Sequence, residues 1–266
     1  KYLRNIDSED KLNQQIFVTT HSSNISAVAG LDNMFMLAYN RNIDPPDCTQ
    51  QSLETHFIDI DGSTKKADAK AHLTKFLDVT RSDMLFADNV ILVEGIAEKL
   101  LMPLFMDKCG IPYEDENISI VEIGGKHFEH FVELFNGNHV KKRVLCITDK
   151  DFKWIVDGVL QSKSDYDSYA VPHIEKLKER FNIENFAVFT QECGGRTFED
   201  ELFITNMSDD SVADVLFDMS VCDSLKAFSK AYKFNISDWI TNIDILDGRT
   251  KKAVKPYLDA YNQRID

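Results

Sequence analysis

The stretch VILVEGIAEKLLMP, residues 90–103, decides the fold. Its four apolar residues, 90–93, predict a strand that is buried on both faces, as in a parallel sheet. Glu94 and Gly95 follow, and a helix is expected next, so Glu98 falls in the first helical turn beside the strand end. Two carboxylates there suggest a divalent metal, because a buried carboxylate is unfavourable without a cationic partner. The alternative is a glutamate stabilised by the N-terminus of the helix dipole.

Strands and helices alternate along the rest of the chain. Further strands are predicted at 16–20, 34–40, 56–60, 118–124, 143–148 and 185–190, and helices at 24–31, 71–79, 96–109, 127–135 and from Pro172 onward. The helix over 96–109 should bury one face formed by Leu100, Leu101, Leu104 and Phe105, and bend at Pro103. This alternation predicts an α/β fold with a parallel sheet and right-handed crossovers. Functional residues should then collect at the carboxyl ends of the strands.

Three of the predicted strand ends carry candidate functional groups besides Glu94. Gly124-Gly125-Lys126 follows the strand at 118–124, Asp149 and Asp151 follow the strand at 143–148, and Glu199 follows the strand at 185–190. If the strands are neighbours, Glu94 and Asp149 lie about 5–10 Å apart. Oxygen ligands at that separation suit Mg²⁺ or Mn²⁺ rather than zinc. Each feature alone could equally be a solvated turn.

The composition of the 266 residues is that of a soluble globular protein, with 43% hydrophobic and 28% charged residues. No apolar run is long enough for a membrane span, and the first residues lack a signal-peptide core, so a cytoplasmic protein without a membrane partner is expected. The five cysteines show no metal-ligand spacing, and buried free thiols are expected. A net charge of −14 argues against coating nucleic acid by bulk electrostatics. The basic cluster 141–143 is expected to be solvated at the far end of the sheet, and 249–255 is the better DNA candidate.

The motifs ILVEG…E, IGG and ITDKD in successive strand–helix units resemble the TOPRIM fold, and residues 72–103 are similar to the C-terminal region of OLD-family nucleases (overcoming lysogenization defect). That group includes the nuclease subunit of the Gabija anti-phage system. The resemblance implies a metal-dependent DNA endonuclease in which two Mg²⁺ or Mn²⁺ ions are bound by Glu94, Glu98, Asp149, Asp151 and Glu199. It also implies a catalytic lysine near the C-terminus, Lys252, with Lys251 as the rival, acting together with Glu94 and Asp149.

The segment VTTHSSNIS, residues 18–26, is similar to the switch-histidine segment of ABC-type ATPases, where His21 would sense the nucleotide. A histidine after a strand is more often structural, and the sequence contains no GxxxxGK[ST] phosphate loop, so ATP could bind only through a part of the ATPase domain that is missing here. We therefore expect a remnant of an ATPase domain at 1–70, a TOPRIM domain at 71–205, and a helical extension at 206–266.

The resemblance implies partners and a role as well as a fold. DNA is the expected substrate, a dimer or higher homo-oligomer is plausible because ABC-type ATPases pair, and a helicase-like partner is expected if the protein is of the Gabija type. Two alternatives share the same residues. A HAD-like phosphatase could use the DKD motif, although that family carries it on its first strand. A catalytically silent TOPRIM assembly module would bind no metal.

Overall fold

The computed structural model describes residues 16–40, 47–59, 61–113, 115–136, 142–152, 155–156, 159–160, 163–193 and 195–206. The chain divides into two compact units. The first contains 1–147 and 177–187, and the second contains 148–176 and 188–266.

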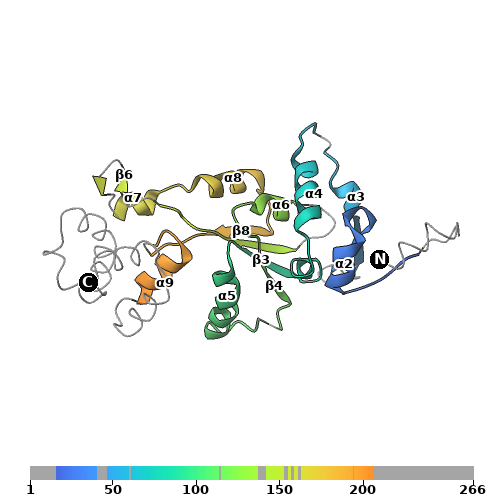
Figure 1. Ribbon diagram of the computed structural model, residues 1–266, viewed down its shortest axis with the longest axis horizontal. Helices are drawn as coiled ribbons and strands as arrows, with labels where there is room; N and C mark the ends of the chain where they lie inside the picture. The colour runs from blue at the N-terminus through green and yellow to red at the C-terminus, as the bar shows by residue number, and fades with distance from the viewer. Residues whose placement is uncertain are drawn as a thin grey trace. The chain divides into compact units, whose positions relative to one another are not determined.

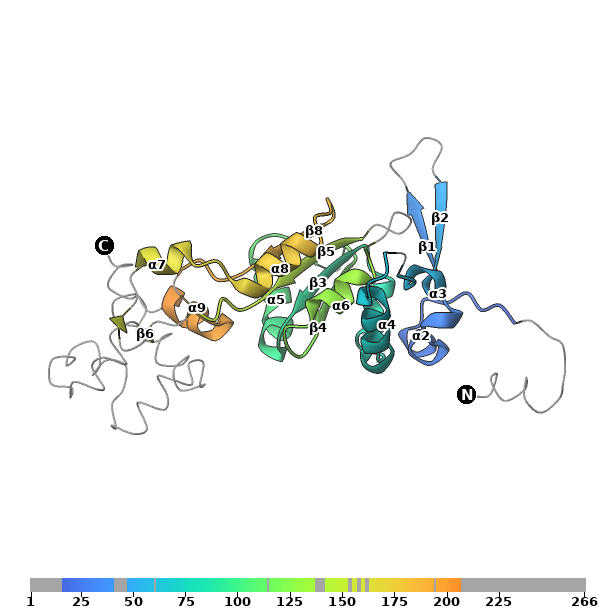
Figure 2. The ribbon, with the colours of Figure 1, turned by 90° about the horizontal axis from the view of Figure 1, so that it is seen from above.

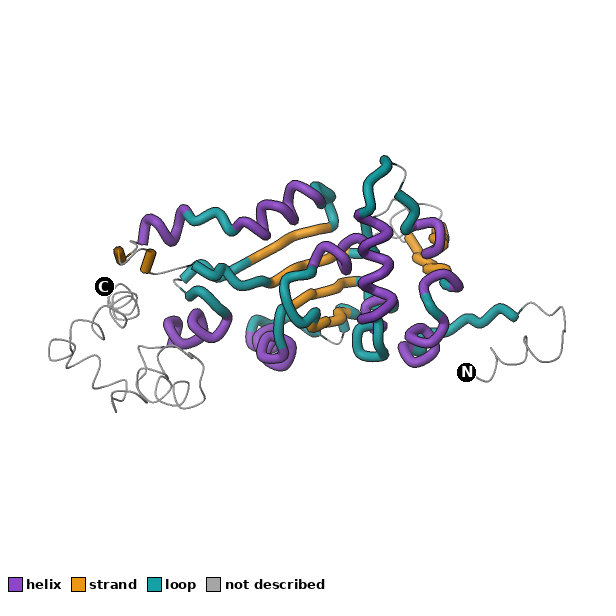
Figure 3. The backbone as a smooth tube through the Cα atoms, turned by 45° about the horizontal axis from the view of Figure 1, so that its top comes forward, coloured by secondary structure: helices purple, strands orange, loops and turns teal. Residues whose placement is uncertain are grey.

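The first unit is built on a parallel sheet whose central strand is the predicted one. Strand β3 (Asn89–Val93) pairs in parallel with β4 (Ile118–Glu122) on one side and with β5 (Arg143–Ile147) on the other. The fourth strand, β8 (Phe186–Phe189), completes the order β4-β3-β5-β8, with Val144 N donating to Asn185 O. Figure 3 shows these strands side by side. The predicted α/β class with a parallel sheet is confirmed.

Helices cover both faces of this sheet in the first unit. Alternate residues of a strand point to opposite faces, and Ile91 and Val93 pack with Ile120 and with Met106 of helix α5 (Ile96–Lys108). Helix α6 (Phe128–Glu133) lies on the other face, beside α4 (Lys65–Phe76) (Figures 1 and 2). Its buried residues include Phe128, Phe131 and Val132. Both faces are therefore buried, which explains why the β3 sequence is apolar without alternation.

The residues before the sheet form a small subassembly. It consists of α2 (Ser23–Ala29), the 3₁₀ helix η1 (Leu31–Asn33), the antiparallel pair β1 (Phe35–Asn40) and β2 (Asp47–Ser52), and the short helix α3 (Leu53–His56). His56 connects it to α6, because its buried ring Nε2 lies 2.7 Å from the main-chain oxygen of Glu133. Asp59 caps α4 by accepting from the backbone N–H groups of Lys66 and Ala67, and these bonds lower the pKa of its carboxyl. A 3₁₀ turn, η2 (Ser82–Leu85), leads into β3.

The second unit contains several short elements. They are the two-residue strands β6 (Ile155–Val156) and β7 (Val159–Leu160), which pair with each other, α7 (Lys163–Ser168), and α9 (Phe198–Asn206). Helix α8 (Pro172–Arg180) begins at Pro172 as predicted and crosses from this unit into the first. Tyr166 is the large aromatic side chain at the centre of these elements, with its hydroxyl donating to Gly195 O at 2.8 Å.

Several predicted elements differ from the observed ones. The predicted strand at 16–20 is irregular and Phe17 is 80% exposed, because no described strand lies beside it to complete a hydrogen-bond ladder. The predicted strand at 56–60 is wrong, since α3 ends at His56 and β2 precedes it. The predicted buried face of α5 is also wrong. Leu100 and Leu104 are 65% and 59% exposed, and the helix turns Met106 and Glu98 inward instead.

Two further expectations about side chains are corrected. Of the described cysteines, Cys146 is buried as expected, and its burial raises the pKa of its thiol, but Cys48, Cys109 and Cys193 are exposed. Lys142, expected in a solvated cluster, is 9% exposed and donates through Nζ to Ala87 O. Its long apolar stem explains how it can be buried. Within the described part of the chain, no helix combines the length and the apolarity that a membrane span needs.

Candidate active site

The candidate site in the first unit lies at the carboxyl end of β3. Val93 is the register partner of both Glu122 on β4 and Ile147 on β5, so these three strands end at the same edge of the sheet. Glu94 follows Val93 directly, and its main-chain oxygen accepts from Gly124 N at 3.1 Å. The predicted adjacency of the strands that precede Glu94 and Asp149 is therefore confirmed.

The turn from β3 into α5 holds Glu98 in a buried position. Its side chain is 6% exposed, although it belongs to the first turn of the helix. Gly95 makes this possible, because a Cβ atom at that residue would lie 3.1 Å from Glu98 Oε2, closer than ordinary van der Waals contact. The missing side chain thus lets a carboxylate lie over the backbone between strand and helix. A buried carboxylate with its oxygens at a strand end is a suitable donor for a hard cation.

The turn after β4 and an arginine that sequence reasoning missed lie at the same edge. Gly124 and Gly125 have φ values of +72° and +139°, which non-glycine residues rarely adopt, so the sequence Gly-Gly is needed for this turn. Arg81 donates from Nε to the main-chain oxygen of Glu122, the last residue of β4, at 2.9 Å, and from Nη1 to Asp78 at 2.8 Å. A single arginine in a polar segment carries no pattern, which is why the sequence did not single it out.

The candidate residue Asp149 is held by a defined network within the second unit. Its Oδ1 accepts from the side-chain amide of Gln191 at 2.8 Å and from the backbone N–H of Phe198 at 2.9 Å. Gln191 in turn accepts from Lys150 N through Oε1 at 2.7 Å, and it is 8% exposed. Asp149 therefore also serves the N-terminus of α9, as a capping carboxylate does. Sequence reasoning missed Gln191, although its position one residue past a strand-end threonine could have drawn attention to it.

The other acidic candidates of the second unit occupy different environments. Asp151 is exposed, has a φ of +53°, and donates its N–H to Arg196 O at 2.8 Å. Glu199 is partly exposed in the first turn of α9. Its neighbour Glu201 accepts from the backbone N–H groups of Cys193 and Gly195, both at 2.7 Å, and so holds the loop before α9. Of these two glutamates, Glu201 has the structural role and Glu199 remains the candidate ligand.

Lys150, between the two aspartates, points away from solvent. Its Nζ lies 3.7 Å from the centre of the Tyr166 ring, a cation–π contact. Burial lowers its pKa, while the carboxylates of Asp167, Glu201 and Glu192 act in the opposite direction. Lys150 therefore anchors the loop after β5 on the Tyr166 ring, and this contact restrains the backbone of the flanking residues Asp149 and Asp151.

The remaining predicted site residues are Lys251, Lys252 and His21. Lys251 and Lys252, and with them the predicted helical extension beyond residue 206, lie outside the described residues. His21 is exposed, and its ring centre lies 5.7 Å from that of Phe86. Its role in nucleotide sensing stays a prediction.

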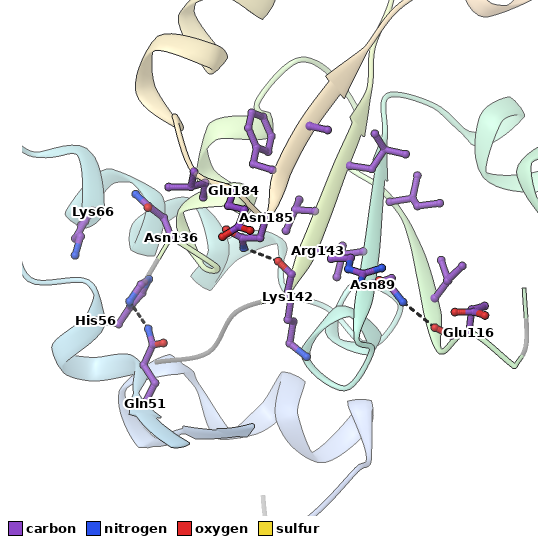
Figure 4. Close-up of a pocket in the computed structure, with 18 of the residues that line it drawn as sticks. Gln51, His56, Lys66, Asn89, Glu116, Asn136, Lys142, Arg143, Glu184 and Asn185 are labelled. Carbon is purple, nitrogen blue, oxygen red and sulfur yellow. Dashed lines mark hydrogen bonds between the residues drawn. The ribbon is translucent and has the colours of Figure 1, made fainter. Parts of the chain in front are cut away.

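A large pocket of the first unit lies at the opposite edge of the sheet. It lies at the amino ends of β3, β4 and β5 and is lined by polar residues that include Gln51, His56, Asn89, Lys142 and Asn185 (Figure 4). Lys142 O accepts from the Asn185 side chain at 2.5 Å, so the pocket wall is itself hydrogen-bonded. None of the predicted metal-binding residues lines this pocket. It is therefore distinct from the carboxyl edge where the candidate acids follow the strands.

Comparison with known families decides what this strand arrangement is. A family profile described as "Overcoming lysogenization defect protein-like, TOPRIM domain" matches residues 85–151. This chain carries an OLD-like TOPRIM domain. The match spans β3, α5, β4, α6 and β5, and it includes Glu94, Glu98, Asp149 and Asp151. The predicted family resemblance and TOPRIM fold are thereby confirmed.

The TOPRIM-bearing chain is similar to two proteins named Endonuclease GajA from Bacillus cereus. It is 34% identical to that of strain VD045 over 89 residues, which are 32% of this chain and 14% of the relative. It is 24% identical to that of strain HuB5-5 over 236 residues, which are 77% and 33%. The chain thus spans no more than about a third of the length of either relative.

Two solved structures also align with the chain. The C-terminal region of the Burkholderia pseudomallei OLD protein aligns with 18% identity and a TM-score of 0.37, covering 66% of this chain and 86% of the other. The C-terminal region of the Xanthomonas campestris pv. campestris OLD protein aligns with 19% identity and a TM-score of 0.35, covering 69% and 94%.

Proposed function

We propose that this chain contains the catalytic centre of an OLD-family DNA endonuclease that depends on divalent metal ions. The observation that carries the proposal is the register of the TOPRIM sheet. Val93 and Ile147 are partners on adjacent strands, and acidic residues follow both of them within two residues. The names of the two curated relatives, both endonucleases, support the same activity.

The proposed ligands for two Mg²⁺ or Mn²⁺ ions are the five predicted acids, Glu94, Glu98, Asp149, Asp151 and Glu199. Carboxylate oxygens are the donors that these hard cations prefer. The buried position of Glu98 fits this use, because the first turn of α5 holds its carboxylate close to the end of β3. When bound, such ions polarise a phosphate and lower the pKa of water.

The residues of the chain itself would position the reacting groups. Gln191 and the backbone N–H of Phe198 fix the orientation of Asp149, and Glu98 is fixed by its burial. We propose that Lys252, with Lys251 as the rival, supplies positive charge near the scissile phosphate. Positive charge at the site is needed for DNA binding, because the chain as a whole carries a net charge of −14.

The wider assignments belong to the same proposal. From the OLD resemblance we also infer an anti-phage or DNA-processing role and regulation by ATP through a further domain with His21. The same resemblance suggests self-association and a helicase-like partner. They are proposals for the longer protein of which this chain resembles the C-terminal part.

The experiment is a plasmid-nicking assay with Mg²⁺ or Mn²⁺. Glu94→Gln and Asp149→Asn should each lower the rate by about two to three orders of magnitude, the usual cost of removing one preorganised catalytic group. The matched controls are Glu116→Gln and Glu184→Gln, because both residues line the pocket at the opposite edge of the sheet and should retain activity. Nicking by Glu94→Gln or Asp149→Asn at the rate of these controls would refute the assignment.

A further inference from the structure

A cluster of imidazole rings lies at the start of α6, outside the acidic candidates. His127 precedes the helix and His130 follows one turn later, and the N–H of His130 donates to His127 O at 3.3 Å. Residues three apart on a helical turn lie on the same side, so the two rings face each other, with centres 6.0 Å apart. Glu129 lies between them in the sequence.

The donor atoms of these three residues are close enough to share one ion. One ligand atom each from His127, Glu129 and His130 lies within 4.8 Å of the other two. Donors about 2.0–2.2 Å from a tetrahedral zinc ion are themselves about 3.3–3.6 Å apart. Side-chain rotation alone can therefore bring the three atoms to coordination distance, because His127 is exposed and the other two are half-buried.

His130 has unused hydrogen-bonding capacity at this place. Its Nδ1 is buried and has no hydrogen-bond partner among the described residues, and its Nε2 lies 3.6 Å from Glu129 Oε1, too far for a hydrogen bond. A buried polar atom without a partner is unfavourable. A cation at this cluster would bind the ring and neutralise the adjacent carboxylate.

Burial disfavours the charged form of two of the three rings, those of His130 and His72. Burial lowers the pKa of His130, with the neighbouring His127 and Arg180 adding to the shift and Glu129 opposing it. Burial likewise lowers the pKa of His72, with His130 and His127 contributing. Neutral imidazoles have no proton to lose on binding a metal, and imidazole suits zinc, copper or nickel better than Mg²⁺.

A second helix closes one side of the cluster. His72, on α4, stacks on His130 with ring centres 4.4 Å apart and lies 5.5 Å from His127. Helices α4 and α6 lie side by side (Figure 2). The cluster is thus walled by a ring from α4, which excludes water from one side of the ligand atoms.

We propose that His127, Glu129 and His130 form a binding site for one divalent transition-metal ion of the zinc type, separate from the acidic metal site proposed above. Three protein ligands leave one coordination position open in a tetrahedral site. Because His127 follows the Gly124-Gly125 turn, a bound ion would restrain the segment that leads from β4 into α6. It would also hold that segment beside the His72 ring of α4.

The test measures Zn²⁺ affinity by competition with a chromogenic chelator, and Co²⁺ coordination by visible absorption. The full chain is used with Glu94→Gln and Asp149→Asn already in place, so that the acidic site does not contribute. One ion should bind, with the absorption of four-coordinate Co²⁺ and without a sulfur-to-cobalt band. His127→Gln should weaken binding by at least about tenfold, since losing even an outer-shell partner costs that much.

The matched control is His21→Gln, because His21 is also exposed but lies outside the cluster, and it should bind Zn²⁺ like the parent. His130→Gln should abolish binding, and circular dichroism checks its fold. If it unfolds, the exposed His127→Gln decides. Binding of equal strength in His127→Gln and His21→Gln, no Zn²⁺ binding by the parent, or a sulfur-to-cobalt band would overturn the proposal. Its failure would leave the nuclease assignment intact, because Glu94 and Asp149, on which that assignment depends, are replaced throughout this assay.

Discussion

Replacing Gln191 tests whether the loop around Asp149 is built as described. Its side-chain amide donates to Asp149 Oδ1 at 2.8 Å, and its carbonyl oxygen accepts from Lys150 N at 2.7 Å. Gln191→Met keeps the length of the side chain and removes these two bonds, together with the one that Oε1 accepts from the Thr190 hydroxyl at 3.0 Å. The bond to the carboxylate contributes about 1.5–3 kcal/mol and the neutral one from Lys150 N about 1 kcal/mol. Since Asp149 keeps its bond from Phe198 N, we expect a loss of about 2–4 kcal/mol in the free energy of unfolding.

Urea-induced unfolding followed by circular dichroism measures this loss. Gln50→Met is the control, because Gln50 is exposed on β2 and its replacement should change stability by less than about 0.5 kcal/mol. Gln191→Glu adds a second test, since it keeps the acceptor for Lys150 N but faces Asp149 with a like charge. One carboxyl pKa of the pair should rise, so Gln191→Glu should be relatively more stable at pH 5 than at pH 7. Equal stability of Gln191→Met and Gln50→Met would show that the described network is absent.

Three other predictions concern the first unit. Arg180→Met should lower the free energy of unfolding in urea by about 3 kcal/mol, because it leaves the buried Glu133 carboxylate without the arginine 2.7 Å away. Adding Glu133→Gln to Arg180→Met should restore much of this loss. If the losses of the two single variants add in the double variant, the prediction is contradicted. Burial lowers the pKa of Lys142 in the folded protein below 10.5, so just below pH 10.5 the unfolded chain binds a proton that the native lysine lacks. The free energy of unfolding should therefore rise with pH in that range, and Lys142→Met should abolish the rise. The same pH dependence in Lys142→Met as in the unsubstituted chain would contradict this prediction. Gly124→Ala, at a φ of +72°, should lower stability by about 1–2 kcal/mol, whereas an unchanged melting temperature would show that the turn is not strained.

The sequence predicted the elements whose signal is local and strong. Three such elements lie where they were expected: the apolar run of β3, which is buried on both faces, the glycine pair after β4, which adopts positive φ values, and Pro172, which begins α8. The alternation of strands and helices predicted a parallel sheet, and the parallel pairing of β3 with β4 and with β5 confirms it.

The errors arose where tertiary contacts override local pattern. Apolar periodicity suggested that Leu100 and Leu104 face the core, but the orientation of α5 is set by how Met106 packs against Ile91. Segment 16–20 is apolar and β-branched, yet a strand forms only with a hydrogen-bonded neighbour. The partners of Asp149 could not be predicted either, because Gln191 and Phe198 are more than forty residues away in the sequence. The residues His127, Glu129 and His130 are close in the sequence, but their segment was interpreted only as a helix.

The central claim is that the acids after β3 and after β5 serve one metal site, and Mn²⁺ binding measured by calorimetry tests it most directly. Affinities are determined for the unsubstituted chain, Glu94→Gln, Asp149→Asn and the double variant. Ligands of shared ions should be strongly non-additive, with a coupling free energy above about 1 kcal/mol. If the two single losses simply add in the double variant, the two acids do not share ions and the account is contradicted.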